Sequence, residues 1–380
     1  SETVLTAGST PGMFTRDTTQ VKPIAGFLQS RTLQVFVNDS TRIMINHGNI
    51  VFSLKPDDRD QAIPVVDFEL DSRSAGGVYG LHRGRISNLY LKANLTQNRR
   101  DTIPDGRTDI RHEFAYADLD MGLERKNRGL LRKWNVNGTL QADGMQLATP
   151  LFPVRTQVRN THLVLQDDRL EIINTQIKAG HSDLLLNGYL TDIRRVLLGH
   201  GSLGLNFDLQ SDTLDCNELI RVVNAGISFA DSLDSKEKSI LQEKILHVES
   251  EKQLEKIISS GIDQQKTYEK LLIVPGNVNL QVVLAVSNAY YRSLQMKGLH
   301  GMLRAADRYL QLDQLQASSN AGDICINGLY ATPDKNNLHV GLDIEMQNVL
   351  LEQVIRLLPP MDTLFPMISS FKGLADVQIS

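Results

Sequence analysis

The chain has little cysteine, no long apolar run and no excess of charge of one sign. Its two cysteines, Cys216 and Cys325, fall at non-equivalent places in the pattern described below. They therefore form no disulfide framework and say little about the cellular compartment. The longest unbroken apolar stretches are short, such as residues 282–286. Because a membrane-spanning helix needs ~20 apolar residues, we do not expect this segment to cross a membrane.

Charge is balanced along the chain, with 40 basic and 44 acidic residues and a net charge of −4. The sequence therefore has no excess or cluster of basic residues, so nucleic acid is not an expected partner. Ser1 is not followed by a basic and then an apolar segment, so a signal peptide or membrane anchor would lie upstream. We expect the chain to be a piece of a longer protein, with enough hydrophobic residues, 41%, to build a core.

Motifs of catalytic and metal sites are missing from the sequence. None of the nine histidines belongs to an H-E-x-x-H motif, and His112 has no second histidine at the required spacing. The pairs Asp57-Asp58 and Asp167-Asp168 lie between expected strands and are interpreted as hairpin turns rather than acid/base pairs. The glycines of residues 76–80 and Gly180 match no nucleotide-binding or nucleophile motif. The sequence predicts no catalytic residue, no metal site and no cofactor.

What the sequence does contain is an internal repeat. Residues 163–190 align without a gap on residues 303–330, at a constant offset of 140 positions (328 minus 188). Self-similarity at a fixed period predicts an elongated architecture in which each unit packs mainly on its neighbours. The matched pairs are Leu170 and Leu310, Ile172 and Leu312, Asp183 and Asp323, Leu184 and Ile324, Leu186 and Ile326, Asn187 and Asn327, and Gly188 and Gly328.

Most of the chain alternates between apolar and polar residues, which is typical of strands with two unlike faces. Residues 65–70, 86–91 and 205–209 are examples, and short turn clusters such as residues 55–59 and 332–337 separate them. The pattern predicts a mainly β fold. We expect a repeated antiparallel meander that forms an elongated curved sheet or groove, with short helices between the repeats and one helical insertion.

Helices are predicted where the repeats end. Asp215 and Glu218 have capping-box spacing at the start of one helix, and the second copy predicts a helix over residues 349–358. Residues 234–261 predict a helical excursion, either packed on the sheet end or acting as a lid. The expected organisation is a diverged β-rich unit (1–126), a first β repeat unit (127–233), a helical insertion (234–268), a second β repeat unit (269–372) and the start of a further unit (373–380).

The run from Leu310 through Asn327-Gly328, residues 341–346, 354–360 and 371–377 resembles the C-terminal region of the AsmA-like family of bacterial envelope proteins, which are related to TamB and YhdP. The resemblance covers residues 127–380. It implies a periplasmic, non-enzymatic protein anchored at the inner membrane by an upstream helix, with a long sheet curled into an open groove. It also implies a function in outer-membrane biogenesis or phospholipid homeostasis, with phospholipid acyl chains and envelope proteins as partners.

A curled single sheet must fill its apolar face with its own side chains, a partner or acyl chains. Two other interpretations stay open: a scaffold module whose apolar rows form a closed core, and a carbohydrate-active enzyme, which would need convergent carboxylates ~5 to 10 Å apart. The candidate groove-lining residues are Leu184, Leu186, Leu205, Phe207, Leu209, Ile324, Ile326, Leu342, Ile344 and Met346.

Overall fold

The computed structural model describes residues 3–9, 21–38, 41–79, 82–97, 118, 125–150, 152–222, 225, 273–334, 337–350 and 374–379. Its elements are β1 (Thr3–Ser9), β2 (Ile24–Asn38), β3 (Thr41–Pro56), β4 (Pro64–Tyr79), β5 (His82–Gln97), α1 (Arg125–Lys133), β6 (Trp134–Thr149), β7 (Phe152–Gln166), β8 (Arg169–Ala179), β9 (Ser182–Thr191), α2 (Ile193–Leu197), β10 (Leu203–Asp215), β11 (Val278–Tyr291), β12 (Leu294–Ala306), β13 (Tyr309–Ser319), β14 (Gly322–Ala331), β15 (His339–Leu350) and β16 (Leu374–Ile379). Residues 216–222 are also helical.

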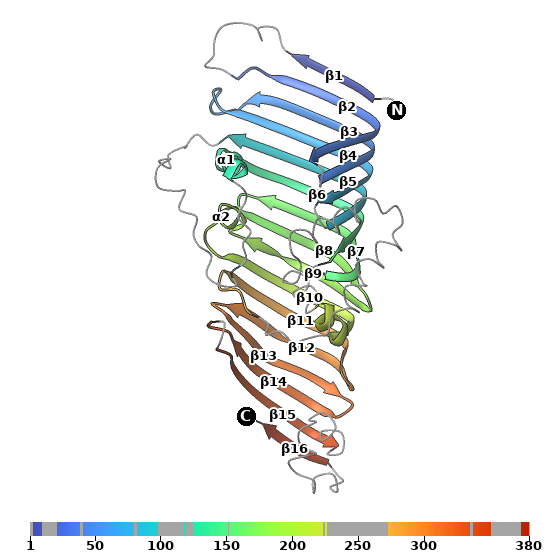
Figure 1. The fold of residues 1–380 in the computed structure, drawn as a ribbon, viewed down its shortest axis with the longest axis vertical. Coiled ribbons are helices and arrows are strands. Elements are labelled where there is room, and N and C mark those ends of the chain that lie inside the picture. The colour runs from blue at the N-terminus through green and yellow to red at the C-terminus, as the bar shows by residue number, and fades with distance from the viewer. Residues whose placement is uncertain are drawn as a thin grey trace.

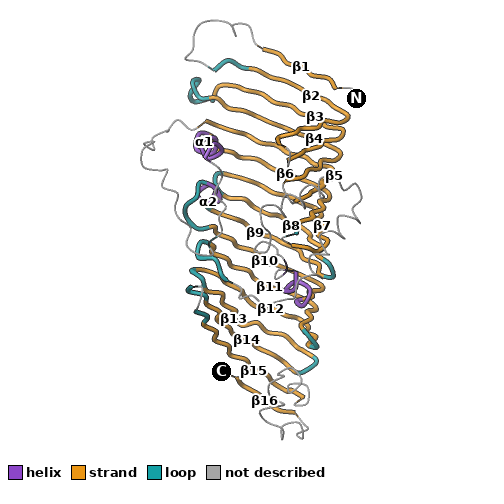
Figure 2. Tube along the Cα trace, in the orientation of Figure 1, coloured by secondary structure: helices purple, strands orange, loops and turns teal. Residues whose placement is uncertain are grey.

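All sixteen strands form one sheet, and their order in the sheet follows their order in the sequence. β1 and β16 lie at opposite ends of the long axis, so the sheet is elongated and not closed (Figure 1). The helices lie near the ends of strands (Figure 2). The mainly β, elongated and curved sheet that the alternation predicts is therefore confirmed.

The meander is antiparallel with one exception, because β10 and β11 pair in parallel. β10 ends at Asp215 and β11 begins at Val278, so the connection between them covers residues 216–277. A parallel pair needs a long crossover, whereas an antiparallel pair can be joined by a tight turn. The helical excursion predicted over residues 234–261 falls within this connection and lies outside the described residues.

The sequence repeat is a repeat of strands. Strands β8 and β9 match β13 and β14 at the same offset of 140, end for end. The register of β8 on β9 shifts between Ile172 and Thr175, and that of β13 on β14 shifts between Leu312 and Leu315. Both copies therefore carry a β-bulge at the same position.

The repeated Asn-Gly dipeptide stabilises these two bulges and the turn between β7 and β8. In each case the asparagine Oδ1 accepts a hydrogen bond from the backbone N–H of a residue with positive φ, a conformation that costs free energy for most residues. The pairs are Asn137 with Asp167 at 2.7 Å (φ 58°), Asn187 with Asn174 at 2.7 Å (φ 46°) and Asn327 with Gln314 at 2.9 Å (φ 45°).

A line of interrupted pairing crosses strands β2 to β7, and we call it the crease. Along it the pairing skips one residue on each strand without changing register. On alternate strands the skipped residue has positive φ, namely His47 (52°), Asn88 (49°) and Asn160 (52°). A Cβ placed on Gly48 would lie 2.7 Å from Ile45 Cγ2. Side chains on the two sides of the crease therefore point to the same face and meet.

The crease divides the sheet into two arms. The long arm contains residues 24–30, 48–56, 64–72, 89–97, 134–142 and 161–166, and the short arm contains residues 32–38, 41–46, 74–79, 82–87, 144–149 and 152–159. At the right-hand side of Figure 1, strands of the N-terminal half bend and fold back over the sheet. The sheet is thus bent into a trough. We call its concave side the inner face and its convex side the outer face.

Side chains from both arms pack together on the inner face at the crease. Ile45, Leu70, Ala75 and Leu89 form a buried cluster there. A second buried cluster lies nearer the C-terminus and includes Val286, Ala289, Leu294, Met296, Ala317, Ala321, Ile324 and Met346. The core is therefore divided between two clusters along a single sheet.

Two predictions near the C-terminus have different outcomes. The helix predicted over residues 349–358 is wrong at its start, because Val349 and Leu350 belong to β15 and pair with Ala375 and Leu374 of β16. The adjacent strand satisfies backbone groups that would otherwise favour a helix. Residues 351–358 lie outside the described residues. The strand predicted near residue 374 is confirmed as β16, hydrogen-bonded to β15 in the same sheet.

Candidate functional site: an apolar trough

The inner face carries an unbroken row of apolar residues and glycines along the long axis of the sheet. Residues paired across adjacent strands project to the same face, so the row follows from the register. It consists of Leu28, Ile50, Leu70, Leu91, Leu140, Leu163, Ile172, Gly188, Phe207, Val282, Leu303, Leu312, Gly328 and Leu342, one residue from each strand from β2 to β15.

A second apolar row runs beside it in the short arm and the strands that follow. It contains Leu33, Ile45, Ala75, Ile86, Met145, Val158, Ile177 and Leu184. Over β2 to β7 the outer face beside the first row is polar, as in the row Gln29, Asn49, Asp71, Tyr90, Gln141 and His162. The sheet is therefore amphipathic, with the apolar side in the trough.

All ten residues predicted to line a groove lie on this inner face. The pairing places Leu186 against Leu209, and Phe207 against Gly188 of the row described above. Leu205 and Leu184 share the face by alternation along β10 and β9. In the second copy, Ile324 pairs with Met346, Ile326 pairs with Ile344, and Leu342 pairs with Gly328.

Burial of these ten residues is graded across the trough. Ile324 and Met346 are buried in the second cluster, with exposed fractions of 5% and 7%. Leu342, nearer the other end of β15, is 46% exposed, and Val340 beyond it is 63% exposed. The others are half-buried. The trough is thus filled by its own side chains at one side and open at the other.

Charged and titratable groups lie away from the inner rows. On the outer face, Lys55 Nζ lies 2.8 Å from Asp67 Oδ2, and this hydrogen bond lowers the pKa of Asp67. His82, at the tip of the short arm, has its Nδ1 2.8 Å from Thr149 Oγ1, and burial lowers its pKa. Burial raises the pKa of the Cys216 thiol, and the charge of Asp215 adds to this effect. Cys216 and Cys325 are both free.

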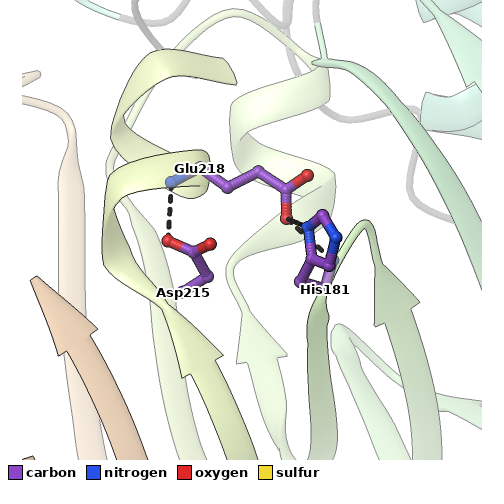
Figure 3. Close-up of side chains that lie close together, drawn as sticks. All are labelled: His181, Asp215 and Glu218. Atoms are coloured by element: carbon purple, nitrogen blue, oxygen red, sulfur yellow. Dashed lines mark hydrogen bonds and ion pairs between the residues drawn. The ribbon is translucent and has the colours of Figure 1, made fainter. Parts of the chain in front are cut away.

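One group of possible metal ligands forms within the described residues. His181 lies in the turn between β8 and β9, Asp215 ends β10, and Glu218 lies in the helix over residues 216–222 (Figure 3). Their ligand atoms all lie within 4.8 Å of one another. No residue spacing indicates this group, because the turn and the helix start meet only when β8, β9 and β10 align.

Hydrogen bonds explain the cluster without a metal. Asp215 Oδ1 accepts from the backbone N–H of Glu218 at 3.0 Å and caps the helix, as predicted. Glu218 Oε2 accepts from the backbone N–H of His181 at 2.7 Å and lies 3.2 Å from His181 Nδ1. A Cβ on Gly180 would lie 2.3 Å from the Glu218 carboxylate. The cluster therefore joins the helix start to the β8–β9 turn.

The paired carboxylates at 167 and 168 occupy a hairpin turn, as predicted. Asp167 and Asp168 connect β7 to β8, and Asp168 Oδ1 accepts from the backbone N–H of Arg194 at 2.6 Å, at the start of α2. Asp57 also forms a turn, since its Oδ1 accepts from the backbone N–H of Arg59 at 2.9 Å. These carboxylates satisfy backbone donors.

Comparison with known proteins identifies no relative. No family model, no curated protein and no solved structure matches this chain. Among the described residues, no helix is both long enough and apolar enough to span a membrane.

Proposed function

We propose that this chain binds phospholipid acyl chains along its inner face and takes part in outer-membrane biogenesis or phospholipid homeostasis. The observation that carries the proposal is the unbroken apolar row from β2 to β15. In line with the AsmA-like resemblance, the protein would be a non-enzymatic, periplasmic component of the bacterial envelope, held at the inner membrane by a segment outside this chain.

The dimensions of the row suit a lipid. Neighbouring strands lie ~4.8 Å apart, so the row extends over on the order of 60 Å. This is several times the ~15 Å depth of one leaflet of a bilayer hydrocarbon core. Each CH₂ group taken out of water contributes ~0.8 kcal/mol. An apolar row without fixed polar partners holds a chain without fixing its position, so chains would slide along the trough while head groups stay at its open side.

In the alternative function, a structural scaffold, the side chains of the apolar rows would be buried against one another in a closed core. The 46% exposure of Leu342 and the 63% exposure of Val340 favour the lipid function instead, because exposed contiguous apolar surface usually marks a binding site. An enzymatic function has no specific support, since Asp57, Asp167 and Asp168 occupy turns and Asp215 caps a helix.

The test is mass spectrometry of lipids extracted from the purified protein, beside a size-matched soluble control. Leu186→Asp and Ile326→Asp place a charge in the trough, and we expect each to reduce the bound phospholipid at least tenfold. Leu185→Asp and Leu329→Asp are the matched controls, because these leucines lie on the outer face of the same strands. They should leave bound lipid unchanged.

Circular dichroism must show the same β content in all four variants. Leu342→Asp is a further trough variant. Because Leu342 is exposed, an aspartate there should destabilise the fold less than an aspartate at a buried position. Wild-type protein that carries no phospholipid above the control, or trough variants that retain it, would reject the lipid function and favour the closed scaffold.

A further inference from the structure

The outer face of the short arm, with strands β8 and β9 beside it, is strongly basic although the chain is acidic overall. On this surface the described carboxylates are Asp143, which accepts a hydrogen bond from Asn88 Nδ2 at 2.7 Å, and Asp183, which accepts from Thr213 N–H at 2.7 Å. The basic residues of the surface are Arg42, Arg73, Arg83, Arg85, Arg155, Arg159 and Lys178.

The outer face of the long arm has a different charge. On β4 the residues Asp67, Glu69 and Asp71 lie on the long arm, whereas Arg73 lies at the crease. Lys55 and Lys92 lie beside these carboxylates on the long arm, so the excess of positive charge is confined to the short arm. Such segregation favours an anionic partner on that side only.

The basic surface contains a depression of about 710 Å³. Three arginines line it, and the uncharged polar side chains around it can donate or accept hydrogen bonds. Arginine presents a planar set of donors that matches phosphate oxygens. The residues concerned are Arg73, Arg85 and Arg159, together with Asn46, Ser74, Ser87, Asn88, Gln146 and Gln157.

Exposed apolar side chains lie at the free edge of the same arm. Phe36, on the outer face of β2, is 62% exposed, and Val35 and Ile43, which pair on the inner face of the same tip, are each 40% exposed. The guanidinium of Arg42 lies 5.1 Å from the centre of the Phe36 ring. Leu147 on β6, also on the inner face near this tip, is 40% exposed. Arginines next to exposed apolar side chains are the combination that binds the interface of a bilayer.

We propose that the outer face of the short arm docks on an anionic phospholipid bilayer. The arginines of the depression bind lipid phosphates, and Phe36, on the outer face at the tip of the arm, enters the boundary between head groups and acyl chains. An exposed apolar side chain favours a bilayer over a nucleic acid, because the phosphate backbone of a nucleic acid provides no apolar region in which to bury it. Docking through this surface does not require the trough to hold lipid.

The experiment is co-sedimentation of the protein with phosphatidylcholine vesicles that contain or lack phosphatidylglycerol. We expect binding only to the phosphatidylglycerol vesicles, weakened by salt. In the triple variant Arg73→Gln, Arg85→Gln, Arg159→Gln, the partition coefficient should fall on the order of a hundredfold, since each arginine near an anionic surface contributes a factor of ~5. The triple variant Lys55→Gln, Lys92→Gln, Arg304→Gln removes the same charge from outer-face positions away from the short arm and should bind like wild type.

If both triple variants lost vesicle binding equally, net charge alone would explain the binding, and the proposal would be overturned. So would wild-type protein that binds double-stranded DNA more tightly than the vesicles, which would indicate a general polyanion surface. Leu186→Asp separates this proposal from the lipid-binding function, because it should lose extracted lipid and keep vesicle docking. Protein that carries lipid without docking on vesicles would reject the docking surface alone.

Discussion

Asparagine side chains fix the irregular positions of this sheet at the scale of single residues. Asn187 and Asn327 accept hydrogen bonds from backbone N–H groups at two equivalent bulges, and the glycine after each lies on the inner row. At Gly188 a Cβ would lie 2.1 Å from the Asn206 carbonyl oxygen. The repeated Asn-Gly pair therefore reflects backbone geometry rather than chemistry at a site.

Replacing this asparagine tests that assignment. We expect Asn187→Ala to lower the free energy of unfolding by about 0.5–1.5 kcal/mol, because the Asn174 N–H loses its acceptor. Asn327→Ala should cost a similar amount, and the two effects should add, since distant sites are usually independent. Urea unfolding measures both, with Asn206→Ala on β10 as the control. Single variants indistinguishable from that control would show that the bulges do not depend on these side chains.

The crease acts at the scale of the strand. Each long strand from β2 to β7 has inner-face residues on both sides of one interrupted position, so one strand contributes to both arms of the trough. Positive φ at His47, Asn88 and Asn160 reverses the alternation there. Without this reversal, one arm would present its polar residues to the trough and bury them against the apolar residues of the other arm.

Substitutions at Asn160 test the conformation of the crease. Asn160→Val should cost about 1–2 kcal/mol of folding free energy, because a β-branched residue is disfavoured at φ 52°. Asn160→Gly should stay within about 1 kcal/mol of wild type, because glycine adopts positive φ readily. Asn206→Val, in extended backbone, should be tolerated. Chemical denaturation with an unchanged m-value is the measurement, and equal costs for valine and glycine at position 160 would contradict the assignment.

At the scale of elements, the sequence predicts strands well because alternation reports directly on a sheet with two unlike faces. It misses the crease, because one skipped residue looks like an ordinary irregularity in the pattern. It also misses the parallel pairing of β10 and β11, which depends on the path of residues 216–277. The helix predicted to start at Val349 fails because pairing with β16 outweighs local helical preference at that position.

At the scale of the whole molecule, the ten predicted groove residues share a face because alternation within each strand and register between strands agree. Alternation could be read from the sequence, whereas register, graded burial and the basic outer arm could not. The grouping of His181 with Asp215 and Glu218 belongs to the same class of missed features, since three separate segments must meet to form it. Whether the inner face holds lipid depends on the assembled trough, so the decisive test must compare its two faces.

Two leucines allow that comparison at nearly equal exposure. Leu342 on the inner face is 46% exposed, and Leu329 on the outer face of the adjacent strand is 42% exposed. A photoreactive benzophenone side chain should therefore have about the same solvent exposure at either position. With lipid present, irradiation should yield a phospholipid adduct at position 342 and little at position 329, as measured by intact-protein mass spectrometry. Equal yields would indicate non-specific contact with lipid, and folded protein without any adduct at position 342 would mean that the trough does not hold lipid.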